Sequence, residues 1–218
     1  MKNAKSFASS FRQSNPDLHG LVISSGLLSM AGRTETEEGI DRKLAVHYYG
    51  RARLILELLP LLEETAKKGE DVRVMTVLAA GKGGKVNWND KDLKTSFSLK
   101  AAADHASTFS DLLVQELAKR HPTISFIHIY PGVVDTPLMN GLPAPMRLLS
   151  KALAPLFAVS ASDCGDAMTY ALTSDRYKSG GKGWLVTDKG EPVREDPALH
   201  NDEDRKKAWE HTLELTNL

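Results

Sequence analysis

The chain has 218 residues, a formal net charge of zero from 28 basic and 28 acidic side chains, 41% hydrophobic residues and one cysteine, Cys164. This length suits one domain, residues 1–218, with a sizeable core, and the balanced charge argues against nucleic acid or an anionic membrane surface as a partner. One cysteine excludes an internal disulfide framework and a cysteine-built zinc site. The polar N-terminus and the lack of a long apolar run predict a cytoplasmic protein without a signal peptide or transmembrane helix.

Short apolar runs alternate with longer helical patterns along the chain. After one helix within residues 5–12, we expect a strand at 21–26, a helix within 39–62, a strand at 72–78, a helix at 98–120, a strand at 124–130, a helix at 162–172, a strand at 183–187 and a closing helix at 202–215. Strands that alternate with helices form right-handed βαβ units, and such units build a parallel sheet. The sequence therefore predicts an α/β fold.

Small and polar residues gather where the expected strands end. These strand ends lie at residues 24–26, 78–84 and 130–136. In open parallel sheets the ligand crevice lies beyond the carboxyl ends of the strands. We therefore expect the active site at these three segments.

Three segments are similar to motifs of a known family. Residues 131–138 read Pro-Gly-Val-Val-Asp-Thr-Pro-Leu, residues 23–26 read Ile-Ser-Ser-Gly, and residues 45–50 read Ala-Val-His-Tyr-Tyr-Gly. They resemble the PG-x-V-x-T, N-N-A-G and A-V-N-x-x-G segments of the short-chain dehydrogenase/reductase family. The resemblance, which covers residues 7–188, implies a partial Rossmann-like, doubly wound parallel sheet that corresponds to the C-terminal half of the family fold.

The resemblance also implies a nicotinamide cofactor, NADP or NAD. The residues it assigns to cofactor binding are Ser25, Gly26, Lys100, Pro131, Gly132, Val133 and Thr136. The family's T-G-x-x-x-G-x-G loop, which holds the cofactor pyrophosphate, is absent before Leu21. Residues 81–84, Gly-Lys-Gly-Gly, lack the spacing of a phosphate loop, so we expect a flexible strand-end loop there. The chain therefore resembles an N-terminally truncated, divergent member.

The catalytic residues of the family are Asn, Ser, Tyr and Lys, and this chain departs from that set. The Asn position holds His47, and the Ser position holds Leu78. Aligning Lys100 with the family lysine places Ser96 at the tyrosine, whereas aligning Phe97 with the tyrosine loses the lysine. Neither register supplies the phenol that protonates an alkoxide near neutral pH. The catalytic residues stay unknown, with His47 and Lys100 as candidates, and no spacing predicts a metal site.

Three functions remain open at this point. The first is an oxidoreductase acting with NAD(P)(H) on a small lipophilic carbonyl or alcohol, a role that suits biosynthesis of secondary metabolites. The second is a catalytically inactive pseudoenzyme that binds a ligand or partner. The third is an incomplete gene model that lacks the nucleotide-binding half.

The strand from Leu21 to Ser25 has a further consequence. The family sheet places three more strands beside it, so in this chain it would lie at the edge of the sheet. An apolar, uncharged edge strand invites pairing with another chain. We therefore expect a homo-oligomer that forms through this edge.

Overall fold

The computed structural model describes residues 1–134, 143–145, 147–148 and 158–216. Its elements are α1 (Lys2–Ser14), β1 (Gly20–Ile23), α2 (Arg42–Leu44), a π-helical turn η1 (Ala45–Tyr49), α3 (Gly50–Lys67), β2 (Val72–Val77), α4 (Leu99–Arg120), β3 (Ile124–Ile129), α6 (Ala161–Thr173), a 3₁₀ turn η3 (Asp175–Tyr177), β4 (Trp184–Val186) and α7 (Asp202–Thr216). Every expected strand and helix is confirmed in its expected order, with ends that differ by a few residues.

The four strands form one parallel sheet in the order β1-β2-β3-β4. The register places Val74 of β2 between Leu21 of β1 and Phe126 of β3. This arrangement confirms the predicted α/β fold with a Rossmann-like parallel sheet.

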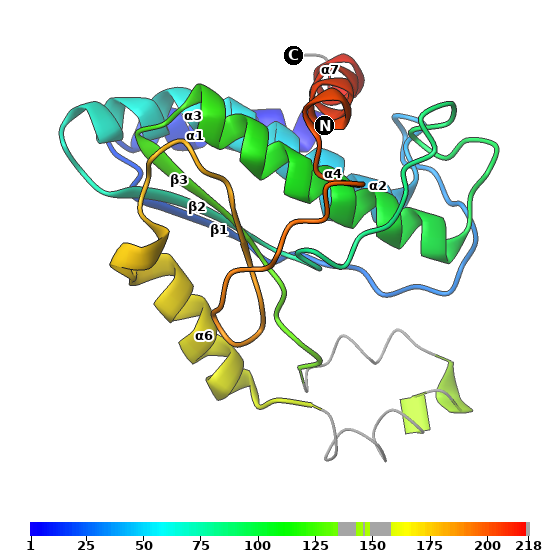
Figure 1. Cartoon of the computed structure of the whole chain (residues 1–218). Helices are drawn as coiled ribbons and strands as arrows, with labels where there is room; N and C mark the ends of the chain where they lie inside the picture. The colour runs from blue at the N-terminus through cyan, green and yellow to red at the C-terminus, as the bar shows by residue number, and fades with distance from the viewer. Residues whose placement is uncertain (135–142, 146, 149–157, 217–218) are drawn as a thin grey trace.

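Helices cover the sheet in two layers (Figure 1). Helices α1, α3 and α4 lie on one face, α7 packs on the outside of α4, and α6 lies on the opposite face. Alternate residues of β2 therefore enter different cores: Val72 and Val74 join the large cluster beneath α3 and α4, and Met75 joins the smaller cluster that includes Ala171 of α6. Burial on both faces explains why β2 is apolar except at Arg73 and Thr76.

β1 is an edge strand among the described residues, as expected. Its Ile23 side chain is buried beneath the helices, whereas Val22, which points to the other face, is 48% exposed. One face and one edge of this strand are thus open to solvent.

Local capping explains where the two central helices begin. The Ser98 side chain accepts a hydrogen bond from Ala101 N (3.0 Å) at the start of α4. The buried Asp41 carboxylate accepts hydrogen bonds from Lys43 N (2.9 Å) and Leu44 N (3.2 Å) ahead of α2. Both are N-caps that satisfy otherwise unpaired amides. No helix in the described part of the chain has the length and apolar character needed to cross a membrane.

Candidate functional site

The end of β1 brings three predicted residues together. Ser25 and Gly26 are exposed, and a Cβ atom added to Gly26 would lie 3.9 Å from His47 Nε2. That nitrogen accepts a hydrogen bond from Leu27 N (3.0 Å), so His47 holds the chain as it leaves the strand. Burial and the nearby Arg51 lower the pKa of His47 to about 4, so the imidazole is neutral at pH 7.

Arg51 of α3 links the carboxyl ends of β1 and β2. Its guanidinium donates to the Thr76 hydroxyl (2.7 Å), to Val77 O (2.8 Å) and to Ser25 O, and the residue is only 4% exposed. Burial lowers the pKa of Arg51 to about 10, and the guanidinium stays charged at pH 7. Arg51 therefore fixes the spacing of the β1 and β2 ends beside the predicted site.

The end of β3 supplies the next predicted segment. Pro131 and Gly132 follow directly, and Val133 is 45% exposed. Gly132 has φ +78°, and an added Cβ would approach the Asp188 side chain to 3.2 Å. Only glycine adopts this conformation without strain at so close an approach. Thr136, the other residue predicted here, lies outside the described residues.

Lys100, predicted both as a catalytic candidate and as a cofactor ligand, lies on the first turn of α4. Its side chain is 82% exposed, and its ammonium forms an ion pair with Asp104 one turn along the helix (2.5 Å). An exposed ammonium with a helical partner of this kind is typical of a solvated surface lysine. The structure thus gives Lys100 an intrahelical partner rather than a contact with the strand ends that hold Ser25 and Gly132.

The glycine-rich segment after β2, for which the sequence predicts a strand-end loop, packs closely against α4. A Cβ on Gly83 would lie 2.2 Å from the Thr108 hydroxyl, and one on Gly84 would lie 2.6 Å from the Asp104 carboxylate. These glycines let the loop backbone touch the helix. Their spacing serves packing, which accounts for its failure to match a phosphate loop.

A buried polar cluster, missed by sequence reasoning, lies beneath the same strand ends. The carboxylate of Asp111 on α4 accepts hydrogen bonds from His128 Nδ1 of β3 (2.6 Å), from His200 Nε2 (3.1 Å) and from Gly81 N (3.1 Å). Burial raises the pKa of Asp111, but the adjoining histidines more than offset it, so the carboxyl pKa lies below its ordinary value. His200 Nδ1 accepts from Asp196 N (3.0 Å), which places the ring proton on Nε2.

The cluster joins four segments: α4, β3, the loop after β2, and the segment before α7. One sequence signal points to this cluster. His128 lies within the mostly apolar run of β3, and a buried imidazole needs a hydrogen-bond partner. Nothing local identifies that partner as Asp111. Among the described residues, no group of three or more His, Cys, Asp or Glu side chains is arranged to hold a metal ion.

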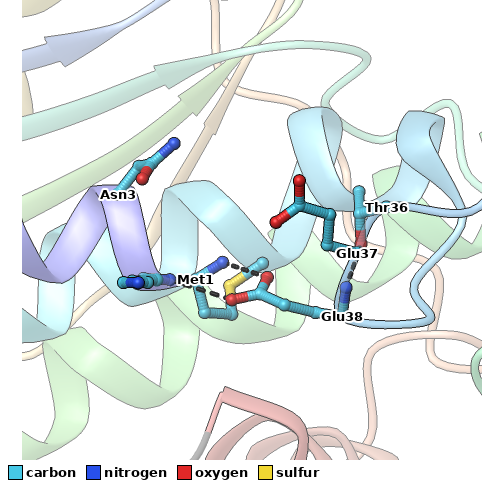
Figure 2. Close-up of a pocket in the computed structure, with 6 residues that line it drawn as sticks. Met1, Asn3, Thr36, Glu37 and Glu38 are labelled. Carbon is cyan, nitrogen blue, oxygen red and sulfur yellow. Dashed lines mark hydrogen bonds and ion pairs between the residues drawn. The ribbon is translucent and has the colours of Figure 1, made fainter.

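A separate hollow of 460 Å³ lies away from these residues. It is lined by Met1, Lys2, Asn3, Thr36, Glu37 and Glu38. Figure 2 shows the Glu38 carboxylate turned toward the amino group of Met1, with which it forms an ion pair. A hydrogen bond from this amino group lowers the pKa of Glu38. None of the predicted site residues lines the hollow.

Comparisons with known proteins identify the family. The chain is 37% identical over 182 residues to "Oxidoreductase AN1596" of Emericella nidulans, covering 81% of this chain and 54% of that protein. It is 32% identical over 174 residues to "Short-chain dehydrogenase/reductase SAT2" of Stachybotrys chartarum, covering 75% and 47%. The chain belongs to the short-chain dehydrogenase/reductase family. No family model matches it.

More distant relatives agree with this assignment. The chain is 27% identical over 222 residues to mouse polyprenol dehydrogenase, covering 99% of this chain and 65% of that enzyme. Its fold matches a crystal structure of NADPH-bound carbonyl reductase from chicken fatty liver with a TM-score of 0.57, 14% identity, and coverage of 88% and 72%. The chain spans about half the length of the first curated relatives it matches.

The described residues that would adjoin a nicotinamide cofactor are the small ones at the strand ends. Ser25 and Gly26 after β1 and Gly132 after β3 are small residues, exposed or half-buried, at the carboxyl edge of the sheet, with the end of β2 between them. No glycine-rich turn at a helix N-terminus, the usual cradle for a pyrophosphate, occurs among the described residues, because residues 81–84 pack against α4. These residues would therefore adjoin the nicotinamide end of such a cofactor rather than its pyrophosphate.

Proposed function

We propose that this protein acts as an oxidoreductase with NADP or NAD on a small lipophilic carbonyl or alcohol. The observation that carries the proposal is that Ser25 and Gly26, after β1, and Gly132, after β3, lie at the same carboxyl edge of one parallel sheet, the position at which open parallel sheets bind ligands. The names of the relatives support the reaction class, and the name of polyprenol dehydrogenase supports a lipophilic alcohol or its carbonyl product.

Each of these residues has a defined role in the proposal. Ser25 and Gly26 would border the nicotinamide end of the cofactor, and Gly132 would let the chain turn close beside it. Arg51 and His47 would act as positioning residues, because they hold the ends of β1 and β2 by hydrogen bonds and His47 is neutral. The bound nicotinamide would supply hydride chemistry.

A ligand-binding pseudoenzyme is the second candidate. It is favoured by the surface position of Lys100 and by the lack of a tyrosine in either alignment register, where Ser96 or Phe97 stands at the family's tyrosine position. In this case the strand-end site would bind a ligand without turnover.

The test is NADPH and NADH oxidation by the purified chain with a panel of hydrophobic aldehydes and ketones. We expect turnover that falls about tenfold or more in Gly132→Val, because valine is strained at positive φ and meets Asp188. Gly20→Ala is the matched control, since its Cβ meets nothing within 4 Å. Cofactor binding without turnover would support the pseudoenzyme instead.

A further inference from the structure

A lysine ammonium lies over the ring of a tyrosine at the carboxyl ends of β2 and β3. Lys82 belongs to the loop after β2, and its Nζ lies 5.6 Å from the centre of the Tyr130 ring. Tyr130 directly follows β3 and packs on the large core cluster, on the same sheet face as α3 and α4. The pair therefore adjoins Pro131 and Gly132 of the candidate site.

Both groups keep free hydrogen-bonding capacity. Lys82 is exposed and forms no ion pair with any acidic residue in the described part of the chain, and the Tyr130 hydroxyl has no hydrogen-bond partner there. The other tyrosines on this face differ, since the buried Tyr48 and Tyr49 hydroxyls already bond to Thr212 and His211. An unpaired cation beside an unpartnered hydroxyl is a donor pair for an oxygen atom that carries negative charge.

The buried cluster around Asp111 fixes both members of the pair. Asp111 accepts a hydrogen bond from Gly81 N, one residue before Lys82, and another from His128, two residues before Tyr130. The backbone on each side is thereby anchored to one buried carboxylate. The four-carbon stem of Lys82 then lets its ammonium adjust to a ligand while the Tyr130 ring stays packed.

We propose that Lys82 and Tyr130 form a donor pair that binds the oxygen of a carbonyl or carboxylate ligand at this edge of the sheet. The pair would orient a carbonyl substrate by its oxygen, in a chain where neither alignment register of residues 96–101 supplies tyrosine and lysine together. The substrate class rests on the proposed oxidoreductase function. The oxygen-binding site itself does not, because it requires no cofactor.

The test uses benzoate as the probe, an apolar ring that carries two oxygen acceptors, titrated calorimetrically into the cofactor-free chain. We expect wild type to bind benzoate and Lys82→Met to bind it about tenfold more weakly or worse, since a charge-assisted hydrogen bond is lost. Tyr130→Phe should weaken binding about three- to tenfold through loss of one neutral donor. Circular dichroism establishes that each variant is folded.

Two controls separate the pair from general charge and ring effects. Lys85→Met removes an exposed lysine from the same loop, and Tyr170→Phe removes a hydroxyl from a 46% exposed tyrosine on α6. Both should bind benzoate as wild type does. The proposal is overturned if folded wild type does not bind benzoate, if the loss occurs in only one of Lys82→Met and Tyr130→Phe, or if Lys85→Met loses as much as Lys82→Met. NADPH binding, measured separately by nicotinamide fluorescence, tests the oxidoreductase proposal. Its result is independent of whether benzoate binds to the Lys82–Tyr130 pair.

Discussion

Replacing Asp111 by alanine removes the carboxylate that joins four segments of the protein. Three donors, His128 Nδ1, His200 Nε2 and Gly81 N, would lose their acceptor in a site with no exposed surface. Each buried donor left unpaired costs about 1–3 kcal/mol. We expect the free energy of unfolding to fall by about 3–5 kcal/mol, because water entering the space left by the carboxylate would satisfy some of the donors.

Urea denaturation followed by circular dichroism measures this change. The matched control is Asp104→Ala on the same helix, which removes an ion pair with the 82% exposed Lys100 and the packing of its carboxylate near Gly84, and should cost less than about 1 kcal/mol. Because the folded pKa of Asp111 is lowered, its contribution is present above the unfolded pKa of about 3.9 and is lost as the pH falls through the folded value. An Asp111→Ala variant as stable as Asp104→Ala at pH 7 would refute the reasoning.

Three further predictions concern packing, pH and association. Gly83→Ala should lower the free energy of unfolding by about 1–3 kcal/mol, because its Cβ would overlap α4. Gly26→Ala is the control and should leave this free energy unchanged, because its Cβ would meet no atom closer than 3.9 Å. Equal urea midpoints for the two variants would contradict the prediction. Burial lowers the pKa values of His47 and His211 to about 4, so the unfolded chain takes up more protons below about pH 6.5 and stability should fall from pH 7 to pH 5 by about 1–2 kcal/mol for each histidine. The double His→Gln variant should remove most of that fall, and an unchanged slope would count against it. Finally, we propose self-association through β1: Val22→Lys should shift sedimentation toward the monomer, and a wild-type chain that stays monomeric at high concentration would exclude this edge as the interface.

The fold could be predicted from sequence because its signals are local. Each strand is a short, mostly apolar run, such as Val72–Val77, and each long helix has its own apolar period. Parallel topology then places all carboxyl strand ends at one edge. For this reason Ser25, Gly26 and Gly132, which are far apart in the chain, could be assigned to one site before any coordinates were known.

The polar groups of the site could not be predicted in the same way. The link from Asp111 to His128 spans 17 positions and that to His200 spans 89, and each depends on how helices pack across the sheet. The hydrogen bond from Leu27 N to His47 could not be predicted either. Alignment with the family shows that His47 replaces an asparagine, but it does not show which group contacts the imidazole. Lys82 and Tyr130 meet only because neighbouring strands end side by side.

Binding of NADPH and NADH to the purified 218-residue chain, followed by nicotinamide fluorescence, tests the central claim most directly. The proposal predicts saturable binding with a dissociation constant below about 1 mM that weakens in Gly132→Val and not in Gly20→Ala. Absence of binding up to millimolar cofactor, by a chain whose circular dichroism and urea transition show it to be folded, would contradict a nicotinamide-dependent function for this polypeptide.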